Sequence, residues 1–292
     1  MKFTTLIIAI FILSASRACD VCPCVPGGGM SGIYPQFRQH FAGLRYQFRS
    51  FSYKQPGDPS ADARMIWHGA DLMGRYTPVK NVQLMATIPL LYGIRKENTQ
   101  IYHNSGLGDI SLQGSVFLIN PGENKIWKHF LSAGAGIKLP TGFSRVQGVP
   151  ASLQTTTGAF DYMINSTWIL RHRRTGLMQD INYRYACKDA RNYQGGQRLT
   201  WSARLFYWKT MGINQHFVPH IFSSVEYAGK DVNRNYYVKK TGGYSVFSGA
   251  GVDYFTTVFS LSLQGSIPVF SKMNDGITLP EPRFQTSFLF YF

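Results

Sequence analysis

Apolar and polar residues alternate along most of this chain, and this period of two is the strongest constraint on its fold. Leu44, Tyr46 and Phe48 share one parity, whereas Arg45 and Arg49 share the other. Successive side chains of a β-strand point to opposite faces, so the alternation predicts strands with one apolar and one polar face. Sustained patterns with the helical period of 3.6 residues are absent. The sequence therefore predicts an all-β protein.

Twelve segments of about 10 to 15 residues carry the alternation. The predicted strands are 41–53, 63–76, 81–94, 108–119, 129–139, 158–170, 177–186, 198–208, 215–227, 243–255, 258–270 and 283–292. Each polar face needs water and each apolar face needs a nonpolar environment. A closed antiparallel barrel in a membrane satisfies both requirements, because lipid covers its outside and water enters its inside.

The connections between these strands alternate in length. Residues 77–80 and 256–257 form short connections, whereas 95–107 and 140–157 are long. Outer-membrane barrels of Gram-negative bacteria have short periplasmic turns and longer external loops. An even number of strands places both termini in the periplasm. The sequence therefore predicts a transmembrane barrel of the outer membrane.

The composition agrees with a lipid-exposed barrel. Hydrophobic residues make up 44% of the chain, aromatic residues 15% and charged residues only 15%. The mean hydropathy of −0.13 is compatible with this fold, because a barrel strand exposes only every second residue to lipid. The formal net charge is +15, but the basic residues form no long run, which argues against nucleic-acid binding. The positive net charge is better explained by attraction to anionic outer-membrane lipid and lipopolysaccharide, or by a lumen that favours anions.

The first 18 residues have the pattern of a signal peptide. Lys2 precedes the apolar run Leu6 to Leu13, and Ser16 and Ala18 are the small residues that a signal peptidase reads. The predicted organisation is then a signal peptide at 1–18, a Cys- and Gly-rich periplasmic or lumenal segment at 19–36, and a barrel at 37–292. The middle segment is expected to enter the lumen as a plug.

Three thiols follow the predicted cleavage site. Cys19, Cys22 and Cys24 form a CxxCxC group on a glycine-rich tether. Soft thiolates favour Cu(I) or Zn(II), which makes these residues candidate metal ligands. A disulfide in the oxidising periplasm and lipidation of Cys19 are the alternatives. Cys187 is expected in an external loop, too distant to act as a fourth ligand.

The C-terminal strand ends in alternating aromatic residues. Phe288, Phe290 and Phe292 resemble the signal by which the barrel-assembly machinery recognises its clients. We therefore expect this machinery to be a partner.

Ionisable residues on the polar faces are the other candidate functional residues. A midplane Arg or Lys facing lipid would cost about 2–4 kcal/mol, so these side chains are expected to line the lumen. They either pair across the lumen and stiffen it or select the solute. The candidates are Arg45, Arg49, Asp71, Asp109, Lys138, Asp161, Asp180, Arg184, Arg204, Glu226 and Asp253.

The sequence contains no HExxH, GxSxG or P-loop motif, so we expect no enzyme and no nucleotide cofactor. The leading hypothesis is a passive channel for a small solute that is hydrophobic, anionic or metal-related. The alternatives are a structural barrel without transport and a metal-binding accessory protein that uses the cysteines.

Two glycine-rich blocks resemble a known family. Residues 106–110 read GLGDI, residues 131–142 read LSAGAGIKLPTG, and Thr157-Gly158 precedes a further alternating strand. This combination resembles the "MetA-pathway of phenol degradation" family of outer-membrane transporters, most firmly over residues 105 to 185. The CxxCxC group and the Gly-rich stretch that follows it resemble a Bacteroidetes-type branch. The resemblance implies a barrel of about twelve strands that passes small molecules.

Overall fold

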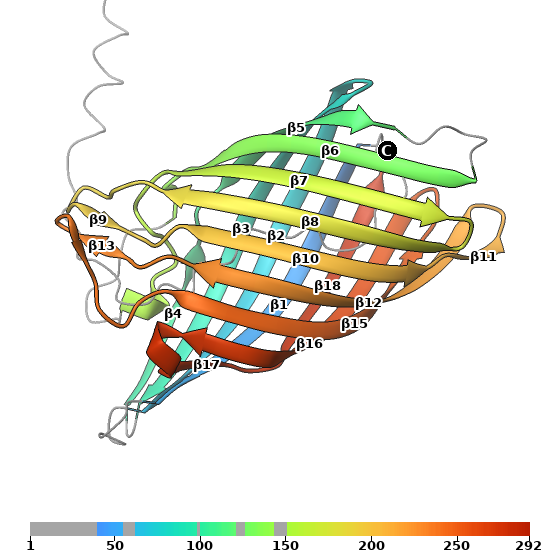
Figure 1. Ribbon diagram of the computed structural model, residues 1–292. Helices are drawn as coiled ribbons and strands as arrows, with labels where there is room; N and C mark the ends of the chain where they lie inside the picture. Colours follow the sequence, from blue (N-terminus) through green and yellow to red (C-terminus); the bar gives the residue numbers. More distant parts are fainter. Residues whose placement is uncertain (1–39, 55–61, 98–99, 121–125, 143–150) are drawn as a thin grey trace, which may run out of the picture.

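The chain folds into a closed antiparallel β-barrel in the computed structural model, which describes residues 40–54, 62–97, 100–120, 126–142 and 151–292 (Figure 1). The strands of the wall are β1 (Phe41–Tyr53), β2 (Ala63–Val79), β3 (Val82–Glu97), β4 (Gln100–Leu107), β5 (Ser111–Ile119), β6 (Trp127–Lys138), β7 (Asp161–His172), β8 (Thr175–Ala186), β10 (Arg198–Tyr207), β11 (Lys209–Gly212), β12 (Gln215–Ala228), β15 (Gly243–Phe255), β16 (Phe259–Met273), β17 (Thr278–Pro280) and β18 (Arg283–Tyr291).

These fifteen strands occupy twelve positions in the wall, because β4 continues into β5, β10 into β11 and β17 into β18. The barrel closes where β1 pairs with β18, from Phe41 opposite Tyr291 to Phe48 opposite Phe284. β1 also pairs with β2 over its whole length. The prediction of an all-β barrel with about twelve strands is therefore confirmed. No described helix is long and apolar enough to span a bilayer.

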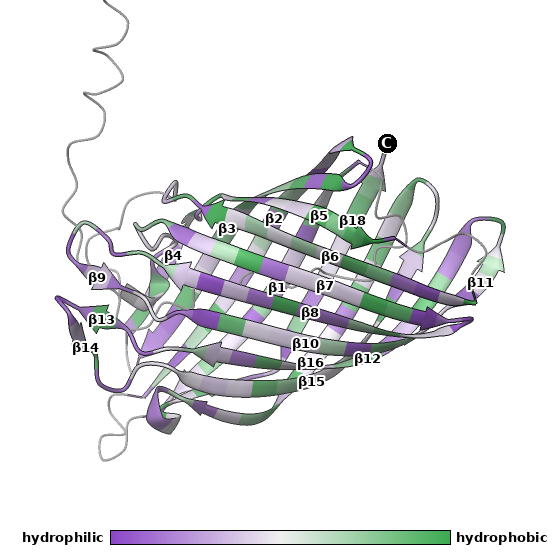
Figure 2. Ribbon diagram, turned by 45° about the horizontal axis from the view of Figure 1, so that its top comes forward, coloured by the Kyte–Doolittle hydropathy of each residue, from purple (hydrophilic) through white to green (hydrophobic). Residues whose placement is uncertain are grey.

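The alternation of the sequence separates the two surfaces of the wall. On β1, Leu44 is 58% exposed on the outer surface, whereas its neighbour Arg45 is 4% exposed on the inner surface. Figure 2 shows hydrophobic and hydrophilic residues following one another along the same strands. Aliphatic and aromatic side chains such as Ile164, Leu205 and Phe288 remain exposed on the outside, where a membrane would cover them.

The inner surface is not polar throughout, which differs from the expected hydrophilic lumen. At the end of the barrel with the short turns, buried apolar side chains pack against one another in two clusters. We call these residues the apolar layer: Phe117, Phe130, Ile169, Met178, Phe206, Val218 and Phe255 in one cluster, and Phe41, Met73, Leu289 and Tyr291 in the other. They come from ten of the twelve wall positions. The barrel is thus packed with apolar groups near this end.

The predicted loop at 95–107 is wrong. β3 extends to Glu97, where it still pairs with β2, and β4 begins at Gln100 and pairs with β3, so these strands form a long hairpin. Two other long connections contain the short strands β9 (Tyr193–Gln194), β13 (Val232–Asn233) and β14 (Tyr236–Tyr237). These three strands pair into a separate small sheet at the long-loop end of the barrel (Figure 1).

The connection between β6 and β7 turns into the barrel. It contains a single turn of 3-10 helix, η2 (Ala151–Leu153), and Leu153 is fully buried against the inward-facing Met65 and Trp67 of β2. The side-chain amide of Asn104 on β4 donates a hydrogen bond to the carbonyl oxygen of Leu153 at 2.6 Å. The sequence predicted this connection as an external loop, but it narrows the lumen from within. We call it the inward loop.

Candidate functional site in the barrel lumen

The eleven ionisable residues predicted from the polar faces all lie on the inner side of the wall. Eight of them are buried: Arg45, Asp71, Lys138, Asp161, Asp180, Arg184, Arg204 and Asp253. Arg49, Asp109 and Glu226 are half-buried. Their inward placement follows from strand parity, except for Asp109, which lies in the short break between β4 and β5. Whether these residues select a solute stays a prediction.

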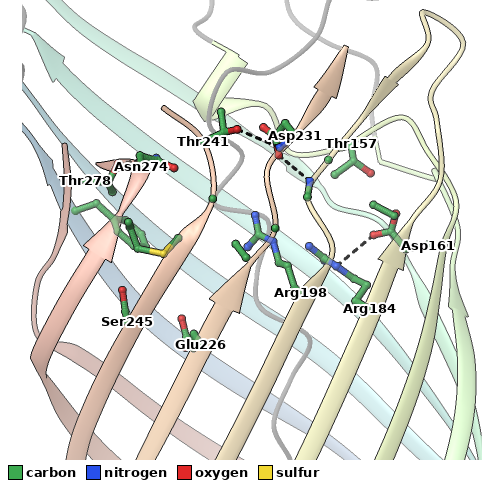
Figure 3. Close-up of a pocket in the computed structure, with 18 of the residues that line it drawn as sticks. Thr157, Asp161, Arg184, Arg198, Glu226, Asp231, Thr241, Ser245, Asn274 and Thr278 are labelled. Carbon is green, nitrogen blue, oxygen red and sulfur yellow. Dashed lines mark hydrogen bonds and ion pairs between the residues drawn. The ribbon is translucent and has the colours of Figure 1, made fainter. Parts of the chain in front are cut away.

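A cavity of about 130 Å³ lies inside the long-loop end of the barrel; we call it the mouth cavity. Figure 3 shows Arg184 and Arg198 among its lining residues, with the Arg184–Asp161 ion pair on one side and Glu226 and Ser245 lower on the wall. Asp231 accepts a hydrogen bond from the backbone nitrogen of Gly196 at 2.7 Å and so joins two loops above the cavity. The mouth cavity is large enough for several water molecules or a small solute.

A second cavity of about 110 Å³, the middle cavity, lies deeper in the barrel. It shares Arg49, Glu226 and Arg283 with the mouth cavity, so these three residues stand where the two cavities meet. Arg283 Nη1 donates to Glu226 Oε1 at 2.6 Å, and the Arg283 guanidinium lies 3.7 Å from the ring centroid of Phe247. The boundary between the two cavities therefore carries charged side chains, and the ring of Phe247 holds the Arg283 guanidinium in place.

A third cavity of about 100 Å³, the side cavity, shares Thr157 and Arg184 with the mouth cavity. An ion-pair network borders it: Lys138 Nζ lies 2.7 Å from Asp109 and 3.3 Å from Asp161, and Arg184 Nε lies 3.4 Å from Asp161. The paired charges are almost completely enclosed by protein, so removing one partner would leave an uncompensated buried charge.

Asp109 also fixes the inward loop at both of its ends. Its carboxylate accepts hydrogen bonds from the backbone nitrogen of Gly142 at 3.2 Å and from the backbone nitrogen of Thr157 at 3.0 Å. The hydroxyl of Thr156 donates to the same carboxylate at 2.5 Å. The backbone nitrogen of Ile110 donates to the hydroxyl of Thr141 at 2.9 Å. The GLGDI and LPTG blocks of the sequence thus meet in space and anchor the loop.

A buried ion pair stiffens the wall between β1 and β2. Arg45 Nε lies 2.7 Å from Asp71 Oδ2, and Gln47 Nε2 donates to the same oxygen at 2.6 Å. Arg49 Nη2 donates to Gln47 Oε1 and extends the network toward the middle cavity. These opposite charges pair between neighbouring strands, so whether charges pair across the lumen, as the sequence suggested, stays a prediction.

The remaining predicted residues have local partners. Thr167 donates a hydrogen bond to Asp180 at 2.7 Å. Asp253 is fully buried with one oxygen 3.5 Å from His220 Nδ1. Arg204 donates to Gln264 Oε1 at 3.1 Å. None of these contacts brings three metal-ligating side chains together among the residues that the structure describes.

Sequence reasoning missed three parts of this lumen. Arg283 was assigned to a strand but not to the site, although its parity matches that of inward-facing Gln285 and Ser287. The apolar layer had a signal, because residues 116–119, 205–208 and 288–292 are apolar at both parities. The inward loop had no such signal, since nothing local in residues 151–157 indicates its contacts with β2 and β4.

Several predicted positions lie outside the described residues. These are the signal peptide at 1–18, the segment at 19–36, and Cys19, Cys22 and Cys24 with their candidate metal. Cys187 is described; it is a free thiol at the end of β8 and lines the mouth cavity. Burial raises the pKa of its thiol. Phe288, Phe290 and Phe292 lie on the outer surface with their side chains exposed.

No family model matches the sequence, and no curated protein matches it. The fold is similar to that of the COG4313 outer membrane channel from Pseudomonas putida F1, with 12% sequence identity and a TM-score of 0.64, covering 89% of this chain and 100% of that chain. The fold is less similar to that of the transport unit of the autotransporter AIDA-I from Escherichia coli, with 9% identity and a TM-score of 0.49, covering 90% of this chain and 93% of that chain. For the NanC porin, the identity is 10% and the TM-score 0.45, covering 85% of this chain and 98% of that chain.

The chain has the fold of an outer-membrane barrel. In a closed antiparallel wall, neighbouring strands satisfy one another's backbone hydrogen bonds, and the apolar outer surface of this wall suits lipid. The outer membrane is therefore its location, as predicted. Outer-membrane barrels place their short turns in the periplasm and their long loops outside, and we expect the same orientation for this barrel.

Proposed function

We propose that this protein is a passive outer-membrane channel for a small solute and performs no catalytic step. The solute would enter at the long-loop end, pass from the mouth cavity to the middle cavity, and leave through the apolar layer into the periplasm. A concentration gradient drives such passage, so no nucleotide or metal cofactor is required. The proposed partners are outer-membrane lipid, lipopolysaccharide and, through Phe288, Phe290 and Phe292, the barrel-assembly machinery.

One observation carries this proposal: three cavities inside the barrel share lining residues. Arg49, Glu226 and Arg283 border both the mouth and the middle cavity, and Thr157 and Arg184 border both the mouth and the side cavity. A fully packed core would not be expected to hold adjoining cavities that are bordered by charged side chains. The resemblance of the GLGDI and LPTG blocks to an outer-membrane transporter family supports the same function.

Planar-bilayer recording and liposome swelling test the proposal directly. We expect the purified full chain to give discrete current steps in KCl and to let small sugars or amino acids equilibrate with vesicles. Steps of low conductance are expected, because the inward loop and the apolar layer both occupy the lumen. Absence of current together with absence of swelling would contradict a channel.

The apolar layer favours a second candidate, a closed structural barrel whose outer loops carry the function. Its side chains are at most 6% exposed. A hydrophobic constriction can exclude water even where a narrow gap exists. The same recordings separate the two candidates, since a structural barrel gives neither current nor solute uptake in any orientation.

A further inference from the structure

The charges that line the middle cavity are unequal. Arg49, Arg204 and Arg283 contribute three guanidinium groups, whereas Glu226 contributes a single carboxylate. Among the residues that line this cavity, positive charges therefore outnumber negative charges three to one, and the inward-facing Asp180 of β8 is a further carboxylate that interacts with Arg204. Arg45, by contrast, is neutralised by Asp71 at 2.7 Å, and Lys138 and Arg184 face Asp109 and Asp161 in the side cavity. The mouth cavity is more nearly balanced, because Asp161, Glu226 and Asp231 accompany its four arginines, Arg49, Arg184, Arg198 and Arg283.

Two of these guanidinium groups have buried N–H groups without a protein partner. Arg204 is 7% exposed, and its Nη1 has no hydrogen-bond acceptor among the described residues. The same is true of Arg283 Nε. A buried donor without an acceptor costs about 1–3 kcal/mol, and more when it is charged. Both residues border the cavity, so an acceptor inside the cavity would satisfy them.

The positions of these guanidinium groups are fixed by other contacts. Arg204 donates its Nη2 to Gln264 and lies 5.6 Å from the ring centroid of Phe222. Arg283 stacks on Phe247 at 3.7 Å and donates its Nη1 to Glu226. Such contacts preorganise a planar cation, so that little side-chain entropy is lost when an anion binds.

The rest of the cavity wall suits a small oxyanion. Neutral donors surround the arginines, namely Thr200, Ser202, Ser224, Gln264, Ser266 and Gln285. Hydroxyl and amide groups can each donate to an oxygen acceptor. A guanidinium fork matches the two oxygens of a carboxylate better than it matches a spherical halide.

We propose that the middle cavity is an anion-binding chamber that gives the channel a preference for small anions bearing a carboxylate or a similar oxyanion. The inference rests on the proposed channel function for its selectivity, but the binding site itself does not require conduction. A solute in the mouth cavity would meet Arg49 and Arg283 first and would then be held between Arg283 and Arg204. Glu226 limits the affinity, so that the anion can leave again.

The first test measures ion selectivity in a planar bilayer with a tenfold KCl gradient. The wild-type reversal potential should indicate a higher permeability for chloride than for potassium. Arg204→Gln should lower the permeability ratio on the order of threefold, since it removes one of the charges that concentrate anions. Glu226→Gln should raise the same ratio, an opposite shift that misfolding cannot produce. Arg204→Lys should retain most of the chloride preference, because it keeps the charge.

Arg64→Gln is the matched control, because Arg64 is an exposed arginine that pairs with Glu281 outside the cavity. Its permeability ratio should equal that of the wild type. Replacing chloride by acetate on one side should show that acetate permeates at least as well as its mobility in water allows. An unselective wild-type current, or equal ratios for Arg204→Gln and Glu226→Gln, would overturn the chamber while leaving the channel intact.

The second test needs no current. Crystals of the full chain in sodium bromide should show an anomalous peak within hydrogen-bond distance of Arg204 Nη1 or Arg283 Nε, and crystals of Arg204→Gln should lose it. If the protein gives no current in the bilayer but the crystal shows this peak, the proposed channel function is wrong and the anion site is supported. Absence of the peak in the wild-type crystal would refute the chamber.

Discussion

Single residues decide how closely the strands approach where the barrel closes. A Cβ atom at Gly43 would collide with the carbonyl oxygen of Phe288 and with the side chain of Leu289 on the adjacent strand. We therefore expect Gly43→Ala to destabilise the barrel by about 1–3 kcal/mol. Gly74→Ala is the control, because no heavy atom lies within 4 Å of its added Cβ. Urea unfolding in lipid vesicles measures both, and equal stabilities of the two variants would contradict this account of the β1–β18 closure.

Glu281 makes the same region sensitive to acid. Burial alone would raise the pKa of this carboxyl group, but hydrogen bonds from Ser50 and Ser52 and the nearby Arg64 hold it below its ordinary value of 4.5. A lowered pKa in the folded state adds stability above the unfolded value and loses it as the pH falls through the folded value. The folded fraction, read from gel mobility without heating, should therefore decline below pH 4.5 less steeply in Glu281→Gln than in the wild type. Parallel curves would show that Glu281 contributes nothing.

The inward loop between β6 and β7 depends on one carboxylate. Asp109→Asn removes the charge that binds Lys138 and weakens the hydrogen bonds from Gly142, Thr156 and Thr157, each worth about 1.5–3 kcal/mol to a charged group. We expect the loop to become accessible to added protease and the unitary conductance to increase. Asp180→Asn is the control, since its carboxylate bonds Thr167 instead. Unchanged proteolysis of Asp109→Asn would contradict the anchoring role.

The strands could be predicted from the sequence, whereas this loop could not. Alternation is a local property, and it assigned the inward-facing side of nearly every strand correctly. The stretch 95–107 was missed because its polar residues resemble a loop, although the backbone pairs β4 with β3. The contacts of Leu153 and Asp109 join residues far apart in the chain. Periodicity carries no information about such contacts.

At the scale of the whole molecule, the apolar layer is the main barrier between the cavities and the periplasm. Replacing Phe206 and Phe255 together by Ala removes two of its rings, each at a cost of about 3–5 kcal/mol in stability. If the barrel remains folded, its conductance should increase severalfold. Leu205→Ala with Tyr254→Ala provides the control, because Leu205 is exposed on the outer surface and Tyr254 lies between the inward-facing Asp253 and Phe255. Equal conductance of the two double variants would exclude the apolar layer as the barrier.

The central claim is that the inner surface of this barrel is a water-accessible route for solute. It is tested most directly by placing single cysteines at Ser224 on the inner surface and at Val225 on the outer surface of β12, in a background whose native cysteines are replaced by serine. A negatively charged, membrane-impermeant thiol reagent should change the single-channel current of the Ser224→Cys protein and leave that of the Val225→Cys protein unaltered. The account is contradicted if the reagent acts equally on both proteins, or only on the outward-facing cysteine.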